Sequence, residues 1–341
     1  MEEVITVGLD LAKGVFQVHG EDGAGCKVWS RPLRRAQMEP FFRKLPACVV
    51  AMEACSSAHH WGRRLTALGH QVRLIPPVYV KPFVARNKTD ARDAQAICQA
   101  AQRPNIRTVA IKSCEQQARG CLHRVRDLLV RQRTQAANQI RGLASEFGLI
   151  ARPGHAGLRD LIAQMAGSDL PEAVRRAIAV QARHHGGLDD QIAELEAQIT
   201  AEARASELAR RMMTIPGVAE ITASAVLAQA PDMTIFRSGR DFAAWLGLTP
   251  LQRSSGGKQA SGGISKRGDK TLRRLLILGA TARLAHQRRS KRPDPWLAGL
   301  LARRPFRVAA VALAAKTARV IWALIVRGGT YQPGHLPRLP V

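Results

Sequence analysis

Acidic residues are scarce in this chain relative to basic ones. It has 26 aspartates and glutamates against 52 lysines and arginines among 341 residues, a formal net charge of +26 at pH 7. So large an excess of one sign points first to a polyanionic partner, and nucleic acid is the commonest polyanion. A basic enzyme that binds no nucleic acid is the alternative that composition leaves open.

Long uninterrupted apolar runs are also missing. The N-terminal residues do not follow the charged, apolar and small-residue order of a signal peptide. The most apolar late stretch, 308–326, is interrupted by Lys316 and Arg319, so we expect a buried helix there rather than a membrane span. A cytoplasmic protein with no membrane partner is therefore expected.

The six cysteines form no Cys-x-x-Cys pair, and none has metal-like spacing with a histidine. We expect reduced thiols and no zinc site. The sequence also has no P-loop, because no Gly-Lys-Ser/Thr follows the required strand and glycine spacing. Chemistry driven by ATP is therefore not expected.

Short apolar stretches separated by turn signals occupy the first 75 residues. They predict strands at 4–10, 15–19 and 27–33, a helix at 35–45, a strand ending at Glu53, a helix at 58–68 and a strand at 70–75. Hairpins come first in this order and crossovers follow. The pattern therefore predicts an α/β domain, a mixed five-stranded sheet with helices on its faces.

Strand character is lost from about residue 113, and helical spacing replaces it. One later stretch carries Leu188, Ile192, Leu195 and Ile199 in a heptad-like seam. This seam fits a short coiled coil or an ordinary amphipathic helix packed on its own domain, and fewer than two heptads do not separate them. We expect an α/β domain at 1–111, a helical region at 112–211, a mostly helical domain at 212–330 and a tail at 331–341.

Four carboxylates stand out in so basic a chain. Asp10 and Glu53 each end a predicted strand, while Asp90 and Asp93 lie three residues apart on one face at the start of an Ala-rich helix. Shared carboxylates can hold two divalent cations, roughly 3.5–4 Å apart, which assist phosphodiester cleavage. Helix capping is an alternative for Asp90 and Asp93, but it does not explain Asp10 or Glu53.

A loop rich in glycine and serine is predicted between Gln252 and Gly268. Glycines let a backbone approach phosphate closely, and nearby lysines and arginines add positive charge. A serine hydroxyl in such a loop could donate a hydrogen bond to phosphate or could attack phosphorus. Chemistry alone favours the hydrogen bond.

Taken together, these motifs resemble one family, the DEDD-type insertion-sequence transposases of the 110/1111 group, also called bridge-RNA-guided recombinases. The strongest single match is Asn87-Lys88-Thr89-Asp90-x-x-Asp93-Ala94. Other matches lie, in order, at 7–13, 52–54, 215–218, 247–250, 254–258, 264–268 and 272–274. The family often has glycine after its Pro-Gly-Val turn, whereas this chain has Ala219.

The resemblance implies a RuvC/RNase H-like N-terminal domain, a coiled-coil part and a smaller transposase domain. It implies Mg²⁺ (or Mn²⁺) held by Asp10, Glu53, Asp90 and Asp93, and a serine nucleophile at Ser255, with the adjacent Ser254 as the alternative. Residues expected to contact nucleic acid are Arg253, Ser254, Gly256, Lys258, Lys266 and Arg267. The implied partners are double-stranded target and donor DNA, a structured guide RNA and further copies of the chain, as a dimer or tetramer in the bacterial cytoplasm.

Two other functions fit the same residues. One is a RuvC-like DNA junction endonuclease that uses metal-activated water, in which the serine loop only grips DNA. The other is a non-catalytic nucleic-acid-binding protein with a decayed nuclease fold. A covalent protein–DNA adduct would distinguish the transposase from both.

Overall fold

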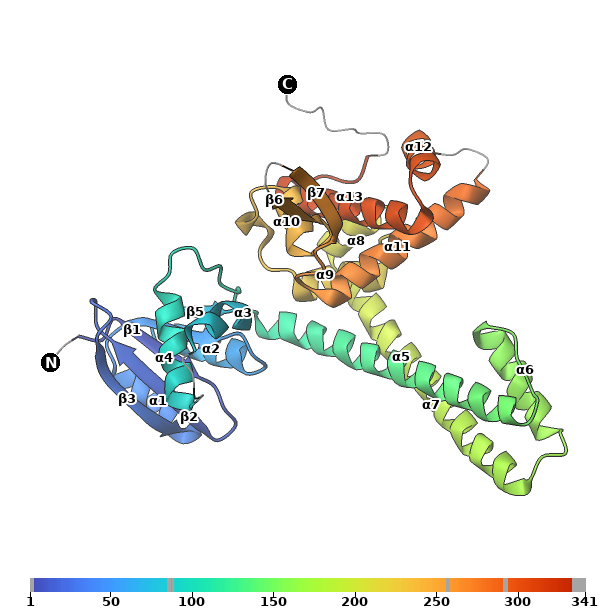
Figure 1. Ribbon diagram of the computed structural model, residues 1–341, viewed down its shortest axis with the longest axis horizontal. Coiled ribbons are helices and arrows are strands. Elements are labelled where there is room, and N and C mark those ends of the chain that lie inside the picture. Colours follow the sequence, from blue (N-terminus) through green and yellow to red (C-terminus); the bar gives the residue numbers. More distant parts are fainter. Residues whose placement is uncertain (1–2, 85–86, 88, 256–257, 291–293, 333–341) are drawn as a thin grey trace. The chain divides into compact units, whose positions relative to one another are not determined.

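The computed structural model describes residues 3–84, 87, 89–255, 258–290 and 294–332 (Figure 1). For the described residues from 253 to 261, it describes the backbone alone. The chain divides into two compact units, Met1–Cys114 and Glu115–Val341. Each unit has apolar cores of its own.

A five-stranded sheet forms the centre of the first unit. Its strands are β1 (Thr6–Asp10), β2 (Val15–Glu21), β3 (Lys27–Arg34), β4 (Val49–Glu53) and β5 (Gln71–Ile75). In the order β3-β2-β1-β4-β5, the first three strands pair antiparallel, while β4 runs parallel to both β1 and β5. The predicted mixed sheet and the RuvC/RNase H-like fold class are confirmed.

Helices cover both faces of this sheet, and its central strands β1 and β4 are accordingly buried on both sides. The helices are α1 (Met38–Lys44), α2 (Ala58–Ala67), α3 (Pro77–Val80) and α4 (Asp90–Ala101), with short 3₁₀ turns η1 (Arg35–Gln37) and η2 (Lys81–Phe83). Val7 and Leu9 of β1 share a core with Phe42 of α1 and Trp61 of α2. Ala51 of β4 lies instead in a second core, with Ile97 of α4.

Two long helices begin the second unit. Helix α5 (Cys114–Glu146) and helix α7 (Glu172–Ala205) are joined through α6 (Gly154–Ala166). Arg126 contacts Glu196, and Arg133, further along α5, contacts Asp189, which lies earlier in α7. The two helices therefore run antiparallel. The seam residues Leu188, Ile192 and Ile199 are buried within this chain.

Shorter helices build the largest core of the second unit. They are α8 (Glu207–Met213), α9 (Glu220–Gln229), η3 (Met233–Ile235), α10 (Gly239–Trp245), α11 (Lys270–Arg289), α12 (Pro295–Arg303) and α13 (Phe306–Arg327). By length and composition alone, α13 is the one helix of the described chain that could cross a membrane, and half of its most apolar window is buried. Leu313, Ala318 and Ile321 of α13 pack in the core, so the helix predicted at 308–326 is a core helix.

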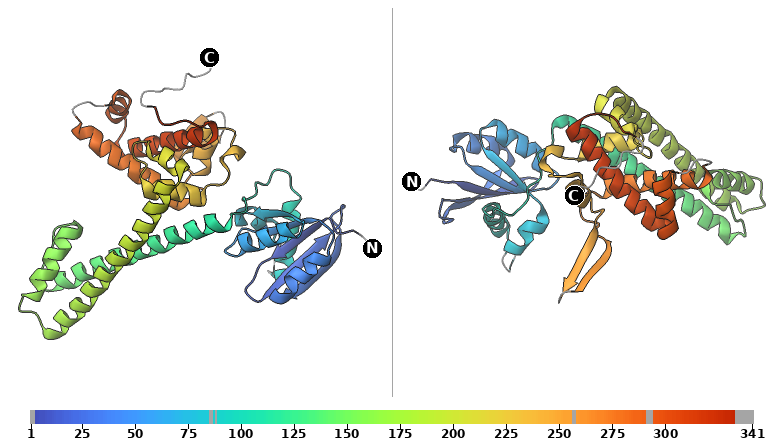
Figure 2. Two further views of the ribbon diagram at one scale, coloured as in Figure 1. Left: turned by 180° about the vertical axis from the view of Figure 1, so that it is seen from behind. Right: turned by 90° about the horizontal axis from the view of Figure 1, so that it is seen from above.

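The segment expected to be a glycine-rich loop is mostly a β-hairpin. Strands β6 (Pro250–Ser255) and β7 (Lys258–Ile264) pair antiparallel, and the hairpin projects from the helices of its unit (Figure 2). The prediction of a loop was wrong because pairing between the two strands overrides the low strand propensity of their glycines and serines.

Candidate functional site

Asp10 and Glu53 are placed by two neighbouring parallel strands. Leu9 of β1 is the register partner of Met52 of β4, and each acid is the next residue along its strand. Parallel strands in register present equivalent residues at the same edge of a sheet. Because each strand ends in an acid, the backbones of Asp10 and Glu53 therefore lie at the same edge of the sheet.

Helix α4 approaches β1 closely because residue 8 is glycine. A β-carbon on Gly8 would lie 2.0 Å from the carbonyl oxygen of Ala94 and 2.8 Å from the amide nitrogen of Cys98. Residues two apart on a strand share a face, so Asp10 lies on the α4 side of the sheet. The close approach sets the first turn of α4 beside the end of β1.

Thr89 caps helix α4, and Asp90 is its first residue. The Thr89 hydroxyl oxygen accepts from the Arg92 amide at 3.3 Å, and the Arg92 guanidinium donates to the Asn87 carbonyl at 2.8 Å. The alternative in which Asp90 itself serves as the cap is therefore wrong. Its carboxylate lies in the first turn, where the helix dipole favours negative charge.

The structure brings three of the four predicted acids together. Carboxylate oxygens of Asp10, Asp90 and Asp93 lie within 4.8 Å of one another, with Asp10 and Asp93 half-buried and Asp90 exposed. Glu53 is half-buried at the end of β4 and is not a member of this group of described side chains.

The chemistry of this group suits a hard divalent cation. Three carboxylates so close together repel one another unless positive charge lies between them. All their donor atoms are oxygens, which Mg²⁺ and Mn²⁺ prefer over nitrogen and sulfur. The residues present therefore fit a divalent cation.

The predicted serine lies at the end of a strand in the second unit. Ser255 is the last residue of β6 and pairs with Lys258, the first residue of β7. Gly256 falls outside the described residues, and Arg253, Ser254, Ser255 and Lys258 are described by backbone alone. The backbone thus places Ser255 and Lys258 opposite each other at the far end of the hairpin.

The base of the hairpin is held by backbone contacts. The Ser265 amide donates to the Thr249 carbonyl at 2.9 Å, and the Lys266 amide donates to the Gly247 carbonyl at 3.1 Å. A β-carbon on Gly268 would lie 1.8 Å from the Trp245 carbonyl oxygen. Lys266 and Arg267 are exposed at this base.

An acid that sequence reasoning missed links the hairpin region to α5. Asp127 accepts from the Thr271 hydroxyl at 3.3 Å and from the Arg274 guanidinium at 2.5 Å. Both partners lie in the first turns of α11, which follows the hairpin. No periodic signal could have found this ion pair, because Asp127 and Arg274 are 147 residues apart.

Comparison with known proteins gives two family matches along the chain. Residues 7–148 match a family model for transposases of the IS110 DEDD type, and residues 209–293 match the model described as "Transposase IS116/IS110/IS902 family". A "Probable family 20 transposase" of Pseudomonas aeruginosa is 51% identical over 334 residues, covering 96% of this chain and 98% of the relative. The "Transposase for insertion sequence element IS1111A" of Coxiella burnetii is 39% identical, covering 98% and 93% respectively.

Proposed function

The chain belongs to the IS110/IS1111 family of DEDD insertion-sequence transposases, and we propose that it cuts and rejoins DNA strands through a phosphoserine intermediate. Membership implies a DNA substrate, strand-transfer activity and dependence on a divalent metal. The observation that carries the metal-dependent cleavage in this proposal is the group of three carboxylates that Asp10, Asp90 and Asp93 form at the end of β1.

In this proposal Asp10, Glu53, Asp90 and Asp93 hold Mg²⁺ or Mn²⁺. When bound, the cation polarises the scissile phosphate and stabilises negative charge on the leaving oxygen. Glu53 is included because it ends β4, the strand beside β1, and directly follows Met52, the register partner of Leu9.

We assign Ser255 as the nucleophile. Its oxygen forms a bond to phosphorus as the bond from phosphorus to the 3′ oxygen breaks, which leaves a 5′ phosphoserine and a free 3′ hydroxyl. Attack by the 3′ hydroxyl of a partner strand reverses the step, so the energy of the phosphodiester is retained. Strand transfer of this kind needs no ATP, in agreement with the missing P-loop.

Basic and small residues around the serine would hold the DNA backbone. Arg253, Ser254, Gly256 and Lys258 lie in the hairpin sequence, and Lys266 and Arg267 are exposed at its base. Phosphate contacts of this kind fix position without reading sequence. Sequence would then be read by a structured guide RNA through base pairing, as in other RNA-guided proteins.

The proposal extends to organisation and location. Residues 112–211 would form a helical region for RNA or for another subunit, and 212–330 the transposase domain. The active species would be a dimer or tetramer in the bacterial cytoplasm.

A suicide DNA substrate tests the nucleophile. The protein is incubated with Mg²⁺, its guide RNA and DNA whose cut product cannot religate, and SDS-resistant protein–DNA adducts are counted. We expect an adduct with the wild type and with Ser254→Ala, and none with Ser255→Ala. An adduct lost only in Ser254→Ala would move the nucleophile by one residue. Cleavage with no adduct in any variant would favour the endonuclease that uses activated water.

A further inference from the structure

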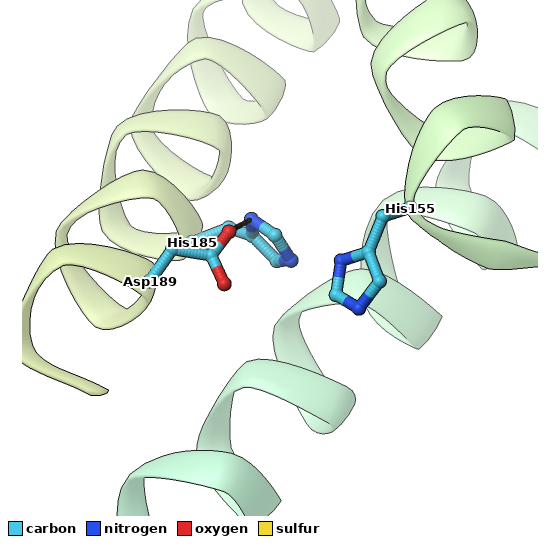
Figure 3. Close-up of side chains that lie close together, drawn as sticks. All are labelled: His155, His185 and Asp189. Atoms are coloured by element: carbon cyan, nitrogen blue, oxygen red, sulfur yellow. Dashed lines mark ion pairs between the residues drawn. The ribbon is translucent and has the colours of Figure 1, made fainter. Parts of the chain in front are cut away.

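A second group of metal-ligating side chains lies in the helical part of the second unit. His155 is in the first turn of α6, while His185 and Asp189 lie on α7. One ligand atom from each of the three lies within 4.8 Å of the others. Figure 3 shows the two imidazole rings facing each other across the gap between these helices, with Asp189 on the His185 side.

The local structure explains why these side chains meet. His185 and Asp189 are four residues apart and therefore share one face of α7. Helix α6 is fixed beside them by an apolar cluster that includes Leu158 and Leu161 of α6 and Ile178 of α7. The Arg141 guanidinium also donates to the Gly154 carbonyl at 2.7 Å, next to His155.

His185 carries a buried nitrogen that the described residues do not satisfy. The residue is 8% exposed, and its Nε2 has no hydrogen-bond partner in the described part of the chain. Its Nδ1 lies 3.4 Å from Oδ2 of Asp189. Leaving a buried ring nitrogen without a partner is costly, and native structures rarely do so.

The charge state of the ring suits a metal ligand. Burial lowers the pKa of His185, and the nearby Arg133, His155 and Arg141 lower it further, although Asp189 opposes this shift. The neutral imidazole is the form that binds metals.

Asp189 is held in place by a neighbour. Its Oδ1 accepts from the Arg133 guanidinium at 2.9 Å, which orients the carboxylate while its other oxygen faces His185. Carboxylates that orient a ligating imidazole in this way are common around protein metal sites. The positive charges of Arg133 and Arg141 weaken cation binding, so affinity must come from the imidazole nitrogens.

We propose that His155 and His185, the latter through its Nε2, bind a divalent transition metal of the zinc class, and that Asp189 at Nδ1 of His185 orients the ring. Zinc takes imidazole nitrogen, and water would fill the positions that the two rings leave open. The oxygen-only group around Asp10 selects harder cations, so the two sites differ in the metal they prefer. A metal here ties the start of α6 to the middle of α7.

The test measures zinc bound by the full-length protein, prepared without a histidine tag. The protein is stripped with a chelator, dialysed against Zn²⁺ in the presence of excess Mg²⁺, and its zinc content is measured by mass spectrometry. The variants are His155→Ala and His185→Gln. The matched control is His184→Ala, an exposed histidine on α7 that is not a member of the group.

We expect the wild type and His184→Ala to hold one zinc per chain more than His155→Ala and His185→Gln. Zinc should also raise the melting temperature of the wild type and of His184→Ala, but not that of His155→Ala or His185→Gln. Since His155 is exposed, its variant should retain wild-type helical circular dichroism, so its loss of zinc cannot be ascribed to unfolding. Equal zinc content in wild type and His155→Ala would overturn the site and leave a polar group bridged by water.

Discussion

Gly8 of β1 and Ala94 of α4 are in such close contact that a β-carbon on Gly8 would lie 2.0 Å from the Ala94 carbonyl oxygen. This contact sets how near the first turn of α4 comes to the end of β1. The grouping of Asp90 and Asp93 with Asp10 depends on it, although Gly8 bears no functional group of its own.

Replacing Gly8 with alanine should therefore damage the acidic site without touching an acid. The added methyl group must displace the α4 backbone, and overpacking of this kind costs about 1–3 kcal/mol. We expect lower stability in urea unfolding and loss of metal-dependent strand cleavage. Gly14→Ala is the matched control, since nothing lies within 4 Å of its added carbon. Wild-type cleavage by Gly8→Ala would show that the helix position does not matter.

The sequence pattern groups Glu53 with the other three acids, but its side chain is not a member of the group that they form in the structure. Substitution of Glu53 tests whether it serves the same site. We expect Glu53→Gln to bind DNA normally but to cleave it at least about 10-fold more slowly, since even residues that merely support a metal site have effects of about 10–100-fold. Glu39→Gln is the control, because Glu39 forms an exposed ion pair with Arg64 in the same unit. Cleavage rates and DNA affinities are measured together. An unchanged rate in Glu53→Gln would remove Glu53 from the metal site.

The net charge of +26 predicts steep salt dependence of DNA binding. Logarithmic affinity should fall linearly with logarithmic salt concentration, and Arg267→Ala should reduce the slope by about one. Arg175→Ala is the control, because Arg175 is already paired with Glu172 one turn away. Binding titrations over a range of salt give the slopes. A flat response of the wild type would contradict the assignment of a polyanionic partner.

His123 should make the second unit sensitive to acid. Its Nε2 lies 3.0 Å from the Ser224 hydroxyl, and burial, followed by the charge of Arg126, lowers its pKa from 6.5 to about 4. The unfolded chain therefore binds a proton at a higher pH than the folded chain does. Above pH 6.5 this difference in pKa does not affect the free energy of unfolding. As the pH falls from 6.5 to 4, the free energy of unfolding should decrease, by up to about 3 kcal/mol at pH 4.

Urea unfolding of wild type and His123→Gln at several pH values isolates this contribution from other histidines. The wild type should lose stability relative to the variant as the solution is acidified below pH 6.5, with no relative change above it. Exposed His184→Gln is the control and should follow the wild type. Parallel curves for wild type and His123→Gln would show that His123 titrates normally in the folded protein.

Most elements of the first unit could be predicted from local patterns. The expected strands at 4–10 and 70–75 and the helix at 58–68 correspond to β1, β5 and α2 within a few residues. Their apolar residues repeat with the period of the element, and period is a local property. The hairpin of β6 and β7 was missed because its glycines and serines have low strand propensity, and pairing between the two strands overrides that preference.

The candidate sites show a similar division. The four acids were recognisable because each lies at a predicted strand end or helix start. The histidine group was not, because His155 and His185 lie on different helices and no spacing along the chain relates them. Their approach depends on how α6 packs against α7.

By itself, the sequence determined the charge of this protein, its element types and, through its motifs, its family. Each of these depends on residue identity and on spacing along the chain. Only the tertiary structure decided that Asp10, Asp90 and Asp93 come together while Glu53 ends the adjacent strand, and that His155 meets His185 and Asp189. Such meetings depend on packing distances between elements, as the contact of Gly8 with Ala94 shows, and no local pattern records those distances.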